Sequence, residues 1–176
     1  MRTWAVSLIG GCTLALTGVA ALAQEESTNR VAAETDWSVF VESDPTECWS
    51  VSSPKQTVNT QNNRVVSVRR GDILLFVAFR PASNVAGEVS FTGGYPFAEG
   101  STVNLNISGN SFELFTEGEW AWPASAADDA RIATAMKRGA EAKLQGRSSR
   151  GTITEDTFSL LGFTAAMEEA QKRCGG

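Results

Sequence analysis

The sequence predicts a mainly β protein of the β-sandwich or jelly-roll kind, with two short helices in its C-terminal third. Short runs of β-branched and aromatic residues recur between turn residues at spacings of about 8–12 residues, which is typical of this class. The most concentrated strand signal is Val65–Arg80, where two such runs flank Gly71-Asp72. We expect roughly eight to ten strands around this segment, with no internal repeat.

Residues 1–23 have the form of a cleaved signal peptide. Arg2 supplies a positive charge, Trp4–Leu22 is apolar or small, and Ala21-Leu22-Ala23 fits the cleavage pattern. Two alternatives stay open: a membrane anchor, because the apolar stretch approaches spanning length, and a lipoprotein, because Ile9-Gly10-Gly11-Cys12 loosely matches a lipobox. We expect an exported protein, periplasmic or associated with the outer envelope, with no stable membrane span after processing.

Cleavage at this site removes Cys12 and leaves Cys48 and Cys174. An even cysteine count in an exported protein indicates a disulfide, the alternative being two separate thiols. The bond would close a loop of about 126 residues and disfavour the unfolded chain by about 4–5 kcal/mol. The chain has no histidine, which argues against a zinc site and against histidine-based catalysis. No metal and no cofactor is expected.

The segment 24–35 is polar and is expected to be a disordered lead-in, followed by a single domain over residues 36–176. A first strand is predicted from Trp37, and a second returns through Cys48. Lys55–Arg64 is polar and is expected to be a loop.

The central part of the fold is expected to be a tight hairpin of Val65–Val68 and Ile73–Phe79 around Gly71-Asp72. Ile73–Phe79 is apolar on both parities, which is typical of a central strand covered on both faces. Further strands are predicted at Glu88–Phe91 and at Thr102–Ser108, where apolar and polar residues alternate.

The chain then returns through a turn predicted at Gly109-Asn110, since both residues tolerate positive φ, into strands at Ser111–Phe115 and Glu119–Trp122. Ser125 is a suitable N-cap for a helix over Ala126–Arg138. After this helix we predict two paired strands, Ala140–Gln145 and Thr152–Leu160, and a second helix, Phe163–Lys172.

Four features in this order resemble the invasion-associated locus B family of exported proteobacterial proteins. They are Asp36-Trp37, Cys48, Ser67–Asp72 and the run Phe158–Ala166 that leads to Cys174. The most telling part is the Ser-Leu-x-Gly-Phe-x-x-Ala step into a short helix that ends in cysteine. The resemblance spans about residues 36–174 and implies a β-rich periplasmic or envelope-associated protein without established catalytic residues. The family is named for a role in host-cell invasion, which nothing in this chain indicates for its source.

Trp120 and Trp122 are candidate ligand-binding residues, because their spacing places both rings on one face of a strand. They could form an exposed aromatic shelf for a sugar or a protein. Packing in the core or between sheets is the alternative.

Arg69 and Arg70 are further candidates, as part of an arginine group with Arg64 and Arg80 that could contact an anionic glycan or lipid head group. The alternative is a solvated edge, or pairing with glutamates on nearby strands, namely Glu113, Glu117 and Glu119. Arg70-Gly71-Asp72 spells an integrin-type tripeptide, which we interpret as a turn.

No nucleophile stands beside a base in the sequence, so we expect no enzyme. The net charge of −5, without any strongly basic region, argues against nucleic-acid binding. The leading hypothesis is a non-enzymatic envelope protein that binds an unidentified envelope protein or glycan. The alternatives are a carbohydrate-binding jelly-roll module and a surface-displayed adhesin or invasion factor.

Overall fold

The structure is a computed structural model that describes residues 29–44 and 46–175. The strands of the first half of the chain are β1 (Arg30–Glu34), β2 (Trp37–Ser43), β3 (Thr46–Ser52), β4 (Gln56–Gln61), β5 (Arg64–Val65), β6 (Leu74–Arg80) and β7 (Val85–Thr92). Those of the second half are β8 (Thr102–Ile107), β9 (Asn110–Glu117), β10 (Trp120–Trp122), β11 (Glu141–Arg147) and β12 (Ile153–Ser159). The helices are a 3₁₀ turn at Pro81–Ser83, α1 (Ala126–Arg138) and α2 (Phe163–Cys174).

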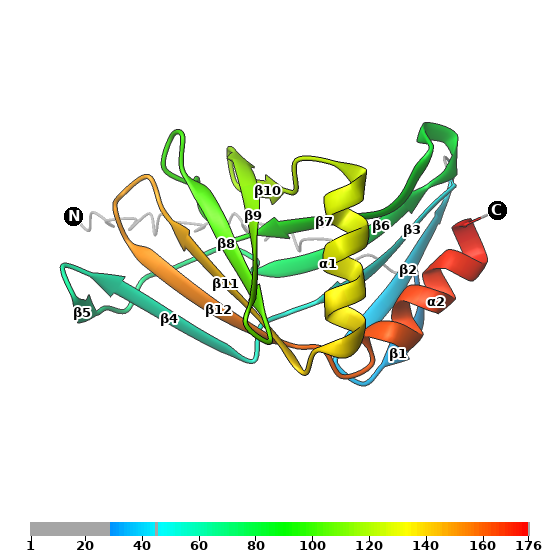
Figure 1. Cartoon of the computed structure of the whole chain (residues 1–176), viewed down its shortest axis with the longest axis horizontal. Coiled ribbons are helices and arrows are strands. Elements are labelled where there is room, and N and C mark those ends of the chain that lie inside the picture. Colours follow the sequence, from blue (N-terminus) through cyan, green and yellow to red (C-terminus); the bar gives the residue numbers. More distant parts are fainter. Residues whose placement is uncertain (1–28, 45, 176) are drawn as a thin grey trace, which may run out of the picture.

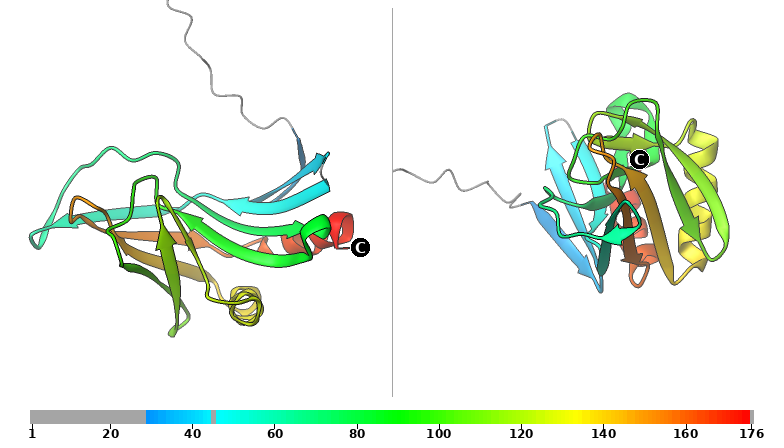
Figure 2. Two further views of the ribbon diagram at one scale, coloured as in Figure 1. Left: turned by 90° about the horizontal axis from the view of Figure 1, so that it is seen from above. Right: turned by 90° about the vertical axis from the view of Figure 1, so that its left-hand side faces the viewer.

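In the described part of the chain, all twelve strands join one antiparallel sheet in the order β1-β2-β3-β6-β7-β10-β9-β8-β11-β12-β4-β5 (Figure 1). The sheet is strongly twisted, so that β6 and β7 run along the long axis of the molecule while β8 and β9 cross it (Figures 1 and 2). The mainly β class, the sandwich-like fold and the two helices are as the sequence predicts.

Both α-helices cover the face of the sheet that carries the core. Helix α2 packs against β1, β2, β3 and β6, and α1 packs against β7. Alternate residues of the strands point to this inner face, for example Leu75, Val77 and Phe79 of β6. The core continues through both helices and the second half of the sheet, with buried residues that include Trp37, Phe91, Leu105, Leu114, Ile132, Met136, Leu144, Phe158 and Phe163.

The C-terminal helix is attached to the sheet at both ends. At its start, Gly162 has a φ of 89°, and a Cβ there would collide with the Glu34 carbonyl oxygen of β1, so glycine is required. At its end, Cys174 forms a disulfide with Cys48 of β3, as predicted. The glycine-phenylalanine step that marks the start of α2 is therefore a packing requirement.

The second half of the chain follows its sequence closely. Helix α1 spans Ala126–Arg138, and the Ser125 hydroxyl accepts a hydrogen bond from the Asp128 N–H as an N-cap. Strands β11 and β12 pair with each other, and β8 has the predicted alternation of buried and exposed residues. The β8–β9 turn differs by one residue, because Ser108 and Gly109 are the two residues with positive φ.

The predicted hairpin around Gly71-Asp72 is wrong. Only its second half is a strand, β6, whereas residues 66–73 form an irregular segment without ladder pairing. Val65 and Val68 are exposed, so the β-branched side chains that suggested a strand have no surface to pack against. The Gly71 N–H instead donates a hydrogen bond of 2.9 Å to the Gly94 carbonyl oxygen.

Two segments expected to lack regular structure contain strands at or next to the edges of the sheet. The predicted loop Lys55–Arg64 contains β4, which pairs with β12, and Asn62 and Asn63 with positive φ form the turn into β5. The predicted lead-in contains β1, which pairs with β2. Edge strands are half solvated and carry many polar residues, so their pattern resembles that of loops. The predicted signal peptide, residues 1–23, lies outside the described residues.

Candidate functional site

The outer face of the sheet, opposite the core, carries a row of aromatic side chains. Inward-facing Leu75, Val77 and Phe79 alternate with outward-facing Leu74, Phe76 and Ala78 along β6. Neighbouring strands add outward-facing aromatics, and successive rings lie in contact: Phe40–Trp49 at 5.9 Å, Phe76–Trp120 at 5.6 Å and Trp120–Trp122 at 6.2 Å between centroids. Because both α-helices pack on the inner face, this row borders solvent.

Small residues between the rings open a hollow of about 350 Å³ in this face. Its aromatic walls are Trp49, Phe76, Trp120 and Trp122. Ala78 pairs with Trp49 across β3 and β6, and Ser90 pairs with Phe76 across β6 and β7, so two short side chains form the floor between large neighbours. Such a concave, mostly apolar site with few polar groups is the usual form of a ligand site.

Charged side chains form the rim of this hollow. Arg80 and Glu88 pair with an N–O distance of 2.5 Å, and both side chains are about 30% exposed, at 29% and 31%. Glu47 lies on the same rim. The rim therefore offers both hydrogen-bond donors and acceptors beside the aromatic walls.

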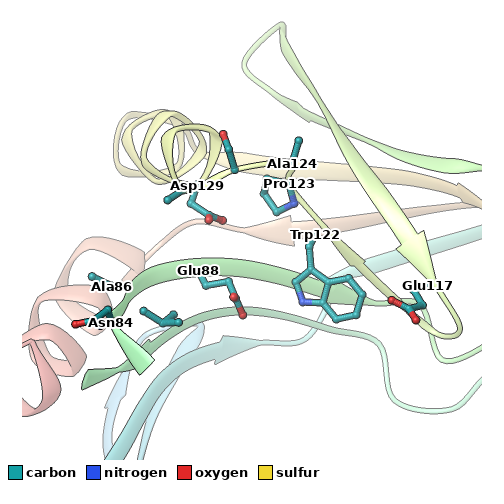
Figure 3. Close-up of a pocket in the computed structure, with 11 residues that line it drawn as sticks. Asn84, Ala86, Glu88, Glu117, Trp122, Pro123, Ala124 and Asp129 are labelled. Atoms are coloured by element: carbon teal, nitrogen blue, oxygen red, sulfur yellow. The ribbon is translucent and has the colours of Figure 1, made fainter. Parts of the chain in front are cut away.

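A second hollow of about 490 Å³ lies next to the first, and Glu88 and Trp122 line both. Figure 3 shows the Trp122 indole between Glu88 and Glu117, with Pro123 and Asp129 on the side of α1. The Asp129 carboxylate accepts a hydrogen bond of 2.8 Å from the Val89 N–H. We call the two adjacent hollows together the outer groove.

The carboxylates in the outer groove influence one another. Partial burial raises the pKa of Asp129, and the charges of Glu88 and Asp128 act in the same direction against the hydrogen bond from the Val89 N–H. The ionised form of Asp129 is thus destabilised, mainly because burial removes water from the carboxylate and secondarily because of the neighbouring negative charges.

The structure places the predicted tryptophans as their spacing indicates. Trp120 and Trp122 lie on one face with their rings nearly parallel, at an interplanar angle of 20°. Trp120 is 38% exposed, and the partly buried Trp122 reaches both hollows. Sequence reasoning missed Trp49 and Phe76, and it considered Glu88 only as a member of a carboxylate pair with Glu113 or Glu119. The available signal was that β6 is apolar at both odd-numbered and even-numbered positions. The odd-numbered residues face the core, and the even-numbered residues face the groove.

The predicted arginine group does not assemble into one site. Arg70 is buried, with 5% of its side chain exposed, and forms a bidentate ion pair with the fully buried Asp156 at 2.6 and 2.7 Å. Its Nε donates to the Gly93 carbonyl oxygen at 2.8 Å, and its guanidinium lies 5.0 Å from the centre of the Tyr95 ring. Arg70 therefore holds the segment 66–73 to the sheet and is not presented as part of an adhesive tripeptide.

The other arginines of this group are dispersed. Arg69 is exposed beside a smaller hollow of about 280 Å³ that Tyr95 and Arg150 also line. Arg80 belongs to the outer groove and pairs with Glu88, which is not one of the predicted partners. Burial raises the pKa of Asp156, and the Arg70 guanidinium opposes this shift.

Among the residues that the structure describes, no three His, Cys, Asp or Glu side chains come together as a metal site would require. Within the same residues, no helix has the length and apolar character needed to cross a membrane.

The model of the family described as "Invasion associated locus B (IalB) protein" matches residues 37–171. This chain therefore belongs to the invasion associated locus B family, as its motifs predict.

A solved structure supports the fold. The crystal structure of invasion associated protein B from Bartonella henselae is similar, with a TM-score of 0.53 and 17% sequence identity. The match covers 80% of this chain and 95% of that chain. A search of curated proteins finds no match.

Proposed function

We propose that this chain is an exported protein of the cell envelope that acts by binding a partner in its outer groove, without catalysis. The observation that carries the proposal is the row of aromatic side chains on the outer sheet face, around a hollow with small floor residues. Exposed aromatic clusters of this kind mark interaction sites, and tryptophan and arginine dominate the energetics of protein interfaces.

Three further observations are compatible with export and with a binding role. The chain belongs to the invasion associated locus B family, and membership of this family supports export. The disulfide between Cys48 and Cys174 is of a kind that persists in oxidising compartments. The buried Asp156 carboxylate forms an ion pair with Arg70 and does not line either hollow of the outer groove.

In-cell photo-cross-linking tests this function. A photo-reactive benzoylphenylalanine at position 120 lies in the outer groove, and the same residue at position 161 is the control, because Leu161 is 62% exposed and does not line the groove. We expect the chain in the periplasmic fraction without residues 1–23, with a discrete cross-linked product from position 120 only. Identical products from both positions, or none from position 120, would contradict the proposal.

A carbohydrate ligand is the second candidate, favoured by one specific feature. The nearly parallel rings of Trp120 and Trp122 present flat apolar surfaces beside the Arg80–Glu88 pair, which could hydrogen-bond to sugar hydroxyl groups. Selective retention of defined neutral oligosaccharides on a glycan array, lost in Trp120→Ala, would favour this candidate over a protein partner.

A further inference from the structure

The outer groove carries an excess of negative charge. Its carboxylates are Glu47, Glu88, Glu117 and Asp129, and its one guanidinium among the lining residues is Arg80. Because Arg80 is paired with Glu88 at 2.5 Å, the other three carboxylates have no cation opposite them among the residues that line the two hollows. A ligand with positive charge would complement this surface, and one with negative charge would be repelled.

The aromatic walls favour the same sign of ligand charge. The face of an indole or phenyl ring is the negative end of its quadrupole and attracts an ammonium or guanidinium group. Trp49, Phe76, Trp120 and Trp122 line one hollow, so that a cation entering above Ala78 and Ser90 would lie among these rings and near the Glu88 carboxylate. The apolar stem of a lysine or arginine would fill the remaining space.

The presence of two adjacent hollows favours an extended chain over a single small cation as the ligand. The two hollows share Glu88 and Trp122 and have volumes of about 350 and 490 Å³, and carboxylates are present in both. An extended peptide with basic residues at alternate positions could place one cation among the aromatic rings and a second beside Glu117 or Asp129.

From the aromatic walls, the unbalanced carboxylates and the two adjacent hollows, we propose that the partner bound in the outer groove is a protein. It inserts an extended basic segment whose lysine or arginine side chain enters the hollow between Trp49 and Trp120. This inference rests on the proposed function and names the chemistry of its partner. Glu88 is a binding residue for the cation, and Arg80 weakens binding because it occupies Glu88.

The Arg80–Glu88 pair provides a test, because removing each charge should change the affinity for a basic peptide in the opposite direction. The probe is a labelled, capped peptide of sequence acetyl-Ala-Lys-Ala-Lys-Ala-amide, titrated by fluorescence polarisation at low salt against the full mature chain. Glu88→Gln leaves Arg80 unpaired at the rim and should weaken binding, whereas Arg80→Gln frees the Glu88 carboxylate and should strengthen it, each by about fivefold. When Trp120→Ala is added to either of these two variants, the peptide should bind that variant more weakly.

Matched controls separate charge from folding. Glu141→Gln removes an exposed carboxylate on β11, outside the groove, and should leave the affinity unchanged. A peptide with norleucine in place of lysine keeps the apolar stem and should bind much more weakly. Equal melting temperatures of the Arg80 and Glu88 variants show that both fold.

Opposite effects of the two substitutions, together with discrimination against norleucine, support a cationic partner. Weaker binding in both variants, equal binding of the norleucine peptide, or no binding of the lysine peptide would overturn it. The proposed function can survive that result, because a cross-link from position 120 that is insensitive to both substitutions would establish the groove as a binding site for a neutral partner.

Discussion

Arg70 and Asp156 form the most deeply buried charged pair that the structure records, and every polar atom of the arginine head group contributes to holding the irregular segment 66–73. The two charges are compensated by a bidentate geometry and by contacts of Arg70 with the Gly93 carbonyl and the Tyr95 ring. A buried ion pair of this kind adds little net stability as a pair, but either partner alone is costly.

Asp156→Ala should therefore lower the free energy of unfolding by about 3–5 kcal/mol, because it leaves the Arg70 guanidinium buried and uncompensated. Urea denaturation measures the change, and Glu141→Ala on the exposed face of β11 is the control, with an expected effect within about 0.5 kcal/mol. The double variant Arg70→Met with Asp156→Leu should recover most of the loss. If Asp156→Ala were as stable as the wild-type chain, the pair would not hold the segment.

The role of Arg70 could not be predicted from its local sequence. Its neighbours Arg69, Gly71 and Asp72 are polar or small and suggest an exposed turn, and its partner is 86 residues away on β12. An aspartate that is buried in a strand is unusual. The one sequence signal that an inward-facing cation was required is Asp156, which lies between Glu155 and Thr157 in a predicted strand.

At the scale of elements, α2 depends on long-range attachments. The Ser50 hydroxyl donates a hydrogen bond of 2.9 Å to the Ala166 carbonyl oxygen, the Trp37 and Phe163 rings meet edge to face at 4.9 Å, and the disulfide joins the last residue of the helix to β3. A 12-residue helix is marginal on its own in water, so these contacts maintain it.

Replacing both cysteines, as Cys48→Ser with Cys174→Ser, should lower the free energy of unfolding by about 4–5 kcal/mol, because the unfolded chain regains the freedom of a long loop. Urea denaturation of the double variant, and of the wild-type chain with and without reductant, measures the difference. The reduced wild-type chain is the control and should resemble the double variant. Unchanged stability in both would mean that the disulfide does not constrain the unfolded chain.

The elements that the sequence predicts well are those whose pattern reflects burial on one face. Strand β8 and helix α1 alternate or repeat cleanly, and the cap at Ser125 defines the start of α1. Strands β1 and β4 were missed because none of their residues is buried. The strand expected at Val65–Val68 failed for the opposite reason: its β propensity is high, but no neighbouring strand pairs with it beyond Val65.

At the scale of the whole molecule, the sheet separates two kinds of apolar surface. The inner face forms the core with both helices, and the outer face of β3, β6 and β10 forms the aromatic walls of the groove. The spacing of Trp120 and Trp122 predicted half of this site. The other half depends on strand order, because Trp49, Phe76 and Trp120 meet only once β3, β6, β7 and β10 are adjacent, which no local pattern reveals.

The most direct test of the central claim, that the outer groove is covered by a partner in the envelope, is hydroxyl-radical footprinting read by mass spectrometry. Oxidation of Trp120 and Trp122 is compared between intact cells and the purified mature chain, with the exposed Leu161 as the internal reference. We expect both tryptophans to be oxidised readily in the purified chain and to be protected in cells, while Leu161 is oxidised equally in both. Equal oxidation of the tryptophans in both settings would contradict the claim.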